Sequence, residues 1–433
     1  MKKYTYKDSG IEWLGEIPEH WKTDRVKDVS RLRDEKIQIK SSDKNYLELE
    51  NLEQGTGKVI DFQDTLEVAS KVMTFKKGDV LFGKLRPYLE KYYLSQEDGY
   101  CTGEILAIEP KSIDNLFFKY FIGSPNFIKQ CDVFSYGAKM PRVNWQTQIG
   151  TFEIPLPPPK EQKAIAEYLD KATDRIDRII AIKQEQLVKM EEMRKSIFFR
   201  ACTQGLNSDS ELIEINDGHI TKMPSHWRYQ RIKRGCKNID TGKTPSSGEP
   251  EYFIDGTIEW FAPECFNDGL IIDKPKKLIN EKAFEDNQIK IYPAQSVYFV
   301  AVGATAGKVG IIQKPSSCNQ QINILETNFK LIPEFLAYQM KIIEKEIIKF
   351  AQYTTLPILN QAKTGYLQIA FPPIEEQKEI IEYLDNYTEK LKKTKVSINY
   401  QIKTLQAYRK SLIHECVTGK KQVTSAIKNQ TYA

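Results

Sequence analysis

The sequence lacks the patterns that hold metal ions, disulfides and membrane spans. Its seven cysteines occur singly, no Cys-x-x-Cys pair is present, and only four histidines could share a zinc ion with them. We therefore expect reduced thiols, most of them packed. No apolar run approaches the about 20 residues that cross a bilayer, and the charged opening MKKYTYKDSGIEWLGEIP has no secretory signal pattern. These absences predict a cytoplasmic protein without a membrane partner.

Motifs of enzymes are missing as well. Residues 303–308 imitate a phosphate-binding loop, but three residues separate the two glycines where that loop needs four, and Val309 replaces the metal-binding Ser or Thr. Asp98, Glu109 and Lys111 loosely imitate a nuclease carboxylate set, a pattern that is frequent by chance. No G-x-G-x-x-G, nucleophile elbow or H-E-x-x-H motif occurs. We predict a non-catalytic chain with no metal and no cofactor of its own.

What the sequence does contain is length and repetition. A chain of 433 residues is longer than one hydrophobic core of roughly 250–300 residues, so several domains are expected. The segment EQKAIAEYLD that begins at Glu161 reappears as EQKEIIEYLD at Glu376, and IPEHWKTDRVK from Ile17 is answered by MPSHWRYQRIK from Met223. The formal net charge of +5 permits a polyanionic partner without requiring one.

The sequences between these matched segments differ strongly, although Lys91 and Lys308, and Cys101 and Cys318, occupy similar places. Each half therefore has a variable body followed by a similar tail. Duplication followed by drift is one explanation, but drift predicts that similarity fades evenly along the repeat. We favour the interpretation that the tails keep one common partner while the bodies meet two different targets.

The tails are expected to be long helices. Neither Pro nor Gly occurs in residues 160–204 or 374–418, and Gly205 and Gly419 follow them. Apolar residues repeat every seven positions, interrupted by Lys183, and form the predicted coiled-coil core: Leu169, Ile176, Met190, Ile197, Leu384, Leu391, Ile398, Leu405 and Leu412. Helices of this length would reach roughly 60 Å. The simplest pairing is antiparallel within one chain, with one body at each end; a parallel dimer of two chains is the alternative.

The bodies predict mixed α/β structure with short strands and exposed loops. Loops rich in basic, amide and aromatic residues suit DNA, because Lys and Arg neutralise phosphates and Arg and Asn can pair with base edges. Tight turns between strands would look similar, so both interpretations stay open. The candidate DNA-binding residues are Lys84, Arg86, Tyr88, Lys91, Lys139, Arg142 and Asn144 in the first body, and Lys243, Thr244, Thr305, Lys308, Thr354, Thr355 and Asn360 in the second.

Several motifs together resemble one known family. They are GIEWLGEIPEHW from Gly10, the two Pro-Pro-x-x-Glu-Gln segments that lead into EYLD helices, LRPYLEK in the first body, and GKTP and VGATAGKVG in the second. The chain resembles the DNA specificity subunits of Type I restriction-modification systems over nearly its whole length.

The resemblance implies an α+β fold in which two mixed α/β target-recognition domains are separated by two long antiparallel coiled-coil helices, as a pseudo-two-fold tandem repeat. The implied domains are 1–158 for the first target-recognition domain, 159–205 for the central helix, 206–372 for the second target-recognition domain, 373–418 for the C-terminal helix and 419–433 for a flexible tail.

The resemblance also implies partners. Such subunits read a bipartite, asymmetric site in double-stranded DNA and bind two methyltransferase subunits, which carry S-adenosylmethionine. Restriction subunits use ATP and Mg²⁺ to translocate and cleave DNA, and the sequence leaves open whether they join this complex. The competing hypothesis is a coiled-coil scaffold whose two bodies bind proteins.

Overall fold

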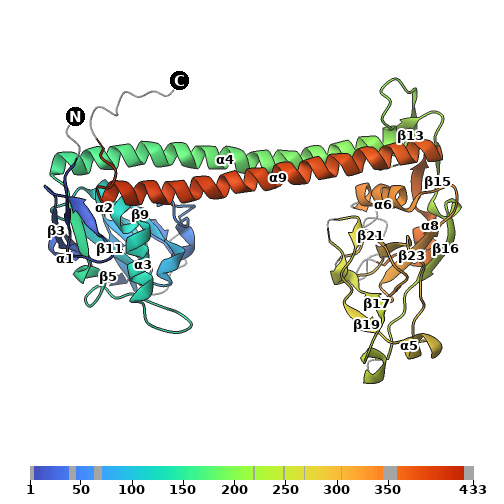
Figure 1. Ribbon diagram of the computed structural model, residues 1–433, viewed down its shortest axis with the longest axis horizontal. Helices are drawn as coiled ribbons and strands as arrows, with labels where there is room; N and C mark the ends of the chain where they lie inside the picture. The colour runs from blue at the N-terminus through green and yellow to red at the C-terminus, as the bar shows by residue number, and fades with distance from the viewer. Residues whose placement is uncertain are drawn as a thin grey trace. The chain divides into compact units, whose positions relative to one another are not determined.

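The computed structural model describes residues 4–38, 45–62, 71–217, 220–246, 249–267, 269–303, 305–344 and 358–423. The chain divides into two compact units. The first unit is made of Met1–Gln184 with Ile398–Ala433, and the second is Glu185–Ser397. Each unit therefore joins one body to one part of each of two long helices (Figure 1).

The long helices are α4 (Pro159–Gln204) and α9 (Ile374–Val417). A proline opens α4, where the missing N–H costs nothing, and a glycine with positive φ follows each helix: Gly205 at +77° and Gly419 at +74°. The Pro and Gly residues from which the sequence predicts the ends of two long helices therefore lie at the helix ends in the structure.

Within each unit, α4 and α9 run antiparallel. In the first unit Asp177 accepts a hydrogen bond of 2.9 Å from Arg409 Nε, and Lys183 contacts Gln401, so the partner numbers fall as those of α4 rise. In the second unit Glu191 pairs with Lys395, and α4 residues further along pack with earlier residues of α9 in one core. The antiparallel coiled-coil prediction is confirmed.

The first body holds two four-stranded sheets, in the orders β5-β7-β10-β6 and β4-β11-β8-β9, and the two-stranded pairs β1-β2 and β12-β3. Its strands are β1 (Tyr6–Asp8), β2 (Glu16–Pro18), β3 (Lys22–Arg25), β4 (Ser30–Leu32), β5 (Lys36–Gln38), β6 (Tyr46–Leu47), β7 (Lys71–Phe75), β8 (Val80–Gly83), β9 (Tyr92–Leu94), β10 (Gly99–Cys101), β11 (Ile105–Pro110) and β12 (Glu153–Leu156). Its helices are α1 (Val26–Val29), α2 (Asn115–Ile122) and α3 (Pro125–Val133).

The second body holds a five-stranded sheet, β16-β23-β20-β21-β18, a three-stranded sheet, β19-β17-β22, and the pairs β13-β14 and β15-β24. Its strands are β13 (Leu212–Asp217), β14 (Ile220–Pro224), β15 (Arg228–Arg231), β16 (Cys236–Thr241), β17 (Ile258–Phe261), β18 (Ile271–Ile272), β19 (Lys277–Ile279), β20 (Val297–Val300), β21 (Val309–Ile312), β22 (Ser317–Cys318), β23 (Ile322–Thr327) and β24 (Gln368–Phe371). Its helices are α5 (Glu281–Glu285), α6 (Pro333–Ile342) and α8 (Gln361–Tyr366).

The two bodies share one topology despite their different sequences. In the first, Cys101 on β10 pairs in parallel with Leu47 on β6; in the second, Cys318 on β22 pairs in parallel with Phe261 on β17. The antiparallel set β9-β8-β11-β4 corresponds to β21-β20-β23-β16. The sparse sequence matches between the bodies therefore mark equivalent positions in one repeated fold.

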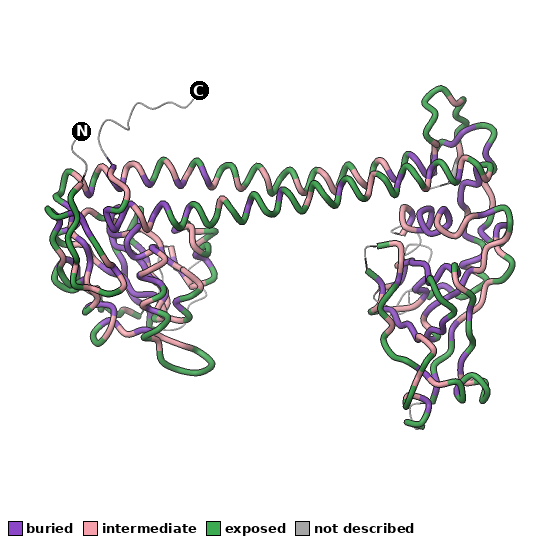
Figure 2. Tube along the Cα trace, in the orientation of Figure 1, coloured by how far each residue is buried: buried purple, intermediate pink, exposed green. Residues whose placement is uncertain are grey.

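Each body shares its main core with the helix ends beside it (Figure 2). In the first unit, the core of the body includes Leu169 of α4 and Leu412 of α9. In the second unit, it includes Phe198 of α4 and Leu384 of α9. Residues 177–197 of α4 include no buried side chain. The helices are thus tied to the bodies at their ends and more exposed between them.

Candidate nucleic-acid interface and helix seams

The structure brings together the two predicted DNA-binding segments of the first body. Lys84 accepts a backbone hydrogen bond from Val143 (3.0 Å), and Arg86 donates one to Pro141 (2.7 Å). Arg86 has the left-handed φ of +52°, and its guanidinium lies 3.4 Å from the Lys139 carbonyl. The turn after β8 and the loop after α3 thus form one surface.

The loop after α3 is a short hairpin closed at residues 136 and 142. Tyr136 and Arg142 exchange backbone hydrogen bonds of 3.0 and 2.9 Å, and Gly137 turns the chain with φ +103°. The Arg142 guanidinium pairs with Glu104 at 3.1 Å, and this hydrogen bond raises the pKa of Arg142 above its ordinary value. Arg142 therefore anchors the base of the hairpin.

The surface formed by these two segments is rich in aromatic, sulfur-containing and basic side chains. Tyr136 is 58% exposed, Met140 49% and Tyr88 45%, and Arg86 and Lys139 are exposed beside them. Apolar exposure of this kind, next to cations, fits contact with base edges and the phosphates that flank them.

Four predicted residues form two equivalent pairs that are bonded within the protein. Lys91 donates to the carbonyl of Leu52, and Lys308 lies 3.5 Å from that of Phe266. The backbone explains the match, because Gly83 bonds to Lys91 and Val300 to Lys308 at the same place in each sheet.

The second pair consists of asparagines that cap turns. Asn144 Oδ1 accepts from the Thr147 N–H (3.1 Å), and Asn360 Oδ1 accepts from the Lys363 N–H (2.9 Å) at the start of α8. These bonds give both asparagines and both lysines structural roles, and a DNA contact for them stays a prediction.

In the second body, Lys243 and Thr244 are exposed in the loop after β16. Lys243 Nζ lies 3.3 Å from the Asn287 carbonyl, and Thr244 contacts the side chain of Gln320. Thr305 is partly exposed in the turn after β20. Two further predicted residues, Thr354 and Thr355, lie outside the described residues.

The structure shows a polar network around Asp240 that the sequence did not predict. Asp240 accepts from Lys290 Nζ (2.6 Å) and Tyr292 OH (3.2 Å), and Gln361 donates to the Thr241 hydroxyl (3.0 Å). Partial burial acts to raise the pKa of Asp240, but the hydrogen bonds from Lys290 and from the Thr241 backbone, together with the charge of Lys290, outweigh it and lower that pKa. The members come from segments up to 121 residues apart, which no short motif could indicate.

The repeated sequence segments form seams between body and helix. Glu161, near the start of α4, accepts from the indole of Trp21 (2.9 Å) and lies 2.8 Å from His20. In the second unit Glu376, near the start of α9, accepts from the indole of Trp227 (2.8 Å), and His226 lies 2.7 Å from it.

The next residue of each repeat extends the seam. Gln162 accepts from the backbone of Asp114 and donates to Pro157, both at 2.8 Å. Gln377 accepts from Ile332 (2.9 Å) and donates to Pro372 (3.0 Å). Both glutamines are buried, and a buried amide that finds partners for its oxygen and nitrogen fixes the angle at which the body meets the helix.

A tyrosine and an aspartate complete each seam. Tyr120 donates to Asp170 at 3.1 Å, and Tyr338 donates to Asp385. Burial raises the pKa of both tyrosines. The sequence reveals the Glu-Gln and Tyr-Leu-Asp motifs as repeats. Their function in joining body to helix could not be recognised there, because their partners in the bodies lie 45 to 150 residues away.

The end of the other helix also reaches each tryptophan. A Cβ added to Gly419 after α9 would meet Trp21 at 3.0 Å, and one added to Gly205 after α4 would meet Trp227 at 3.2 Å. Each tryptophan therefore lies between the start of one long helix and the end of the other.

The predicted coiled-coil core residues lie along the helices with graded burial. Buried are Leu169, Ile176, Leu384, Leu391, Ile398 and Leu412, and partly buried are Met190, Ile197 and Leu405. Lys183 is partly buried and contacts Gln401. Past α9, residues 419–423 pack on the first unit with Val423 buried, and the remainder of the predicted flexible tail, 424–433, lies outside the described residues.

The acidic residues that imitate a nuclease set are engaged elsewhere. Glu109 pairs with Arg31 (2.7 Å) and Lys111 (2.8 Å), and the hydrogen bond from Lys111 lowers its pKa. Asp98 accepts from the Lys77 backbone. Within the described ranges, no three His, Cys, Asp or Glu side chains are grouped as metal ligands, and no helix there is both long and apolar enough to cross a membrane.

Fold and seams together define an internally repeated protein, in which two mixed α/β bodies of one topology are each fastened to an antiparallel helix pair. The family model of the Type I restriction modification DNA specificity domain matches the chain twice, at residues 18–189 and 224–404. The chain belongs to this family and carries two copies of its domain.

Similar proteins agree with this assignment over nearly the whole chain. The MjaX specificity subunit of Methanocaldococcus jannaschii is 23% identical, covering 95% of this chain and 96% of its own. The type I restriction enzyme MjaIX specificity subunit of that organism is 22% identical, covering 95% of each.

Two solved structures share the fold. A chain from a study of complex assembly in the type I R-M system has a TM-score of 0.72 at 18% identity and covers 94% of this chain and 99% of its own. The HsdS subunit from Thermoanaerobacter tengcongensis has a TM-score of 0.57 at 19% identity, covering 94% and 98%.

Proposed function

We propose that this chain is the sequence-reading subunit of a Type I restriction-modification complex. Each body reads one part of a bipartite DNA site, and the paired helices set the gap between the parts. Methyltransferase subunits supply the chemistry. The observation that carries the proposal is the repeated seam, in which Trp21 with Glu161 and Trp227 with Glu376 fasten two bodies of different surface to one kind of helix.

The first body offers a reading surface at the hairpin and the turn beside it. Its hairpin is held by two backbone hydrogen bonds and by the pair of Arg142 with Glu104. A two-stranded ribbon of this size fits the major groove. Lys139 is exposed in the hairpin, and Arg86 is exposed in the turn beside it. We assign base or phosphate contact to these two cations, and a positioning role to Arg142.

The two bodies present different chemistry for the two parts of the site. The loops of the second body carry Lys243, Thr244 and Thr305, whereas the exposed surface of the first body carries Arg86, Tyr88 and Tyr136. Different side chains read different bases, so the two half-sites are expected to differ, and the DNA target is expected to be asymmetric.

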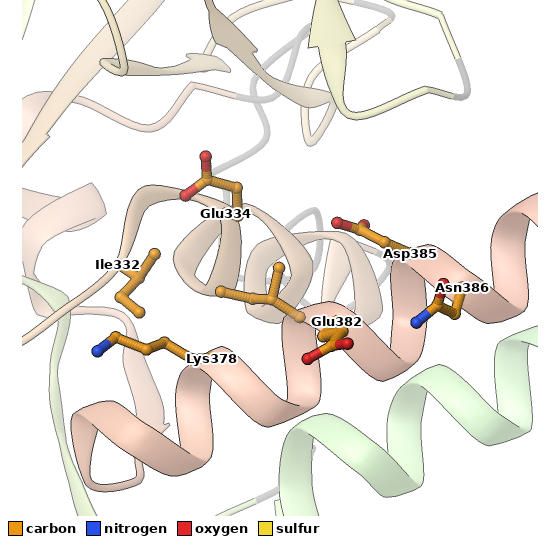
Figure 3. Close-up of a pocket in the computed structure, with 7 residues that line it drawn as sticks. Ile332, Glu334, Lys378, Glu382, Asp385 and Asn386 are labelled. Atoms are coloured by element: carbon orange, nitrogen blue, oxygen red, sulfur yellow. The ribbon is translucent and has the colours of Figure 1, made fainter.

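A docking surface for methyltransferase is supported by repeated residues that the seams do not use. Lys163 and Lys378 are exposed at equivalent positions of the two helices. Tyr383 is 43% exposed, whereas its counterpart Tyr168 packs against the first core. Figure 3 shows the surface on α9, where Lys378 and Glu382 line a hollow of about 420 Å³. An identical outward residue in both repeats fits a partner that binds twice.

The long helices expose apolar side chains between their ends. On α4 these include Ile182 (64%) and Val188 (59%), and on α9 Val396 (65%) and Tyr400 (72%). Such exposure on a coiled coil is typical of a surface that another subunit covers. Two methyltransferase subunits, one for each repeat, are the occupants that we propose; they carry S-adenosylmethionine, and any restriction subunits would carry ATP and Mg²⁺.

The direct test is to purify the full chain with its methyltransferase subunit and to select bound sequences from random double-stranded DNA. We expect two short defined runs of different sequence, separated by a gap of fixed length. Recovery of no preferred sequence, with the methyltransferase bound, would favour a protein scaffold instead. Methyl transfer by the chain alone would contradict the assignment of catalysis to the partner.

A further inference from the structure

Basic residues are concentrated at the start of the second body. Between residues 228 and 237 five cations occur with no acidic residue among them: Arg228, Arg231, Lys233, Arg234 and Lys237. All five are exposed on β15, the turn after it and the start of β16. Among the described residues, none of the five forms an ion pair with a carboxylate. Glu326, on the strand that pairs with β16, accepts from Asn238 at 3.2 Å.

The equivalent segment of the first body is neutralised by acids. Arg25 at the end of β3 pairs with Asp28 at 2.7 Å, and this hydrogen bond raises the pKa of the guanidinium. Asp24 precedes it in the chain, and Glu153 is its partner across the strand pair of β3 with β12. Three carboxylates therefore surround this arginine.

In the second body the three equivalent positions carry no negative charge. Arg231 is the counterpart of Arg25, since both end the strand that follows the His-Trp pair. Asp24 is replaced by Gln230, and Asp28 by Arg234. The residue opposite Arg231 across the strands is Gln368. One topological position is thus acid-balanced in the first body and strongly positive in the second.

An exposed aromatic ring and a hollow lie among these cations. The guanidinium of Arg231 lies 4.4 Å, and the ammonium of Lys233 4.5 Å, from the ring centroid of Tyr366, which is 51% exposed on α8. Lys233, Lys237 and Gln361 help to line a hollow of about 500 Å³. Ring contact holds the cations in place while leaving their charge unneutralised.

We propose that Arg231, Lys233 and Lys237, arranged around Tyr366, form a second DNA contact that binds backbone phosphates and has no counterpart in the first body. The proposal rests on the proposed DNA-reading function and names a surface outside the loops assigned to reading. Its consequence is that the two bodies differ in kind: the second holds DNA more through charge, and the first relies more on its hairpin.

Charge and composition favour DNA over a protein as the occupant. Protein interfaces are enriched in arginine and tyrosine but depleted in lysine, and their centres are apolar. Two of the three cations here are lysines, and among the described residues that line this hollow Tyr366 alone is an exposed large hydrophobic residue. Asp240, close by on β16, already accepts from Lys290 at 2.6 Å. Cations without acidic partners, beside amides and one ring, match a phosphate backbone.

The test compares two charge-matched triple variants of the full chain in complex with methyltransferase. One is Arg231→Gln, Lys233→Gln and Lys237→Gln in the second body; the other is Arg25→Gln, Lys27→Gln and Arg31→Gln in the first. DNA affinity is measured by salt titration on the selected site. Each phosphate contact contributes about 0.9 to the slope of log affinity against log salt, so we expect the second-body variant to lose about 2 to 3 units and the first-body variant less than about 1.

The selected DNA sequence is expected to stay the same in the second-body variant, because phosphate contacts carry no base information. The single variant Lys237→Gln should lower the slope by about 1 and guards against a folding defect in the triple variant. Equal slopes for the two triple variants would overturn the proposal, and so would loss of methyltransferase binding with the slope unchanged, which would assign the surface to a protein. If the wild-type chain selects no DNA sequence, the proposed function fails instead.

Discussion

The indole nitrogen of Trp21 donates a hydrogen bond of 2.9 Å to Glu161, the residue that opens the repeated Glu-Gln motif of α4. His20 lies 2.8 Å from the other oxygen of the same carboxylate. The second unit repeats the arrangement with Trp227 and Glu376. The residues that recur between the two halves of the chain are therefore in large part those that join each body to its helices.

Replacing Glu161 with Ala is expected to destabilise the first unit by about 1–3 kcal/mol, because a partly buried indole N–H loses its acceptor. Urea unfolding of the full chain measures the change, and Glu376→Ala should behave alike in the second unit. Glu185→Ala is the control, since Glu185 forms a fully exposed pair with Lys189, and solvent screens such pairs so that they contribute little to stability. If the free energy of unfolding of Glu161→Ala equals that of this control, the contact of Glu161 with Trp21 does not stabilise the first unit.

Arg409 joins α9 to α4 and to the first body. Its side chain, 7% exposed, donates to Asp177 (2.9 Å) and to the carbonyls of Gly55 (2.7 Å) and Thr56 (3.0 Å). We expect Arg409→Met to cost about 1–3 kcal/mol of unfolding free energy, because the Thr56 carbonyl loses its donor and the buried ion pair with Asp177 is lost. Asp177 keeps Lys58 at 2.9 Å, and the Gly55 carbonyl keeps the Tyr92 hydroxyl at 3.2 Å.

The repeat supplies a matched control for these contacts of Arg409, which we call the clamp. Arg194 occupies the equivalent place on α4, but it is 28% exposed and pairs with Glu191 of its own helix. Arg194→Met should cost less than about 1 kcal/mol in the same unfolding measurement. Similar losses at the two arginines would show that the clamp on the first body contributes little.

The exposed cations of the first-body hairpin and of the turn beside it are expected to bind DNA. Replacing Arg86 and Lys139 with Ala should weaken binding of the selected site about tenfold or more and lower the salt slope, while leaving stability within about 0.5 kcal/mol. Arg142→Ala should lower stability as well, since it breaks the pair with Glu104. Lys36→Ala, an exposed substitution elsewhere in the body, is the control. If the variant that lacks Arg86 and Lys139 binds DNA as tightly as this control, the two cations do not contact DNA.

Thiol labelling at pH 8 is expected to distinguish the cysteines by burial. All seven are free, and burial raises the pKa of Cys101 and Cys416 to about 12, so thiolate is scarce at pH 8. Cys265 is partly exposed, and its pKa is raised less. It should react first, and Cys265→Ser should abolish the fast phase. Rapid labelling of the fully buried Cys202 in the native protein would contradict the packing.

The long helices could be predicted from the sequence because their signals are local. Pro and Gly mark the ends, and the seven-residue repeat marks the face that becomes buried at Leu169 and Leu384. The antiparallel pairing could be predicted because each long helix has an apolar face that needs to be buried. The second long helix of the same chain offers a matching apolar face. The pseudo-two-fold repeat of two mixed α/β bodies was expected from the matched segments and the family resemblance. The strand order within each body could not be predicted, because it depends on pairing between distant segments.

The candidate DNA-binding residues were chosen from the sequence by residue type, and their contact with DNA stays a prediction. The two cation-bearing segments of the first body do meet, at Arg86 and Pro141, but the sequence could not tell an exposed lysine from one that bonds inside the protein. Lys91 was chosen for its charge, and its partner, the carbonyl of Leu52, lies 39 residues away. The charge difference between the two strands that end at Arg25 and Arg231 was visible in the sequence but acquires meaning only when the strands are known to be equivalent.

The central claim is that the paired helices measure the gap between two half-sites. Lys183 contacts Gln401 in the first unit, and Glu191 pairs with Lys395 in the second, so residues 183–189 of α4 and 395–401 of α9 can be deleted together in register. Removing seven residues shortens each helix by about 10 Å, which corresponds to about 3 base pairs of DNA. Methylome sequencing of cells that carry the deleted chain with its methyltransferase is expected to show the same two sequence runs with a shorter gap between them. The same runs with an unchanged gap and full methylation would contradict the account.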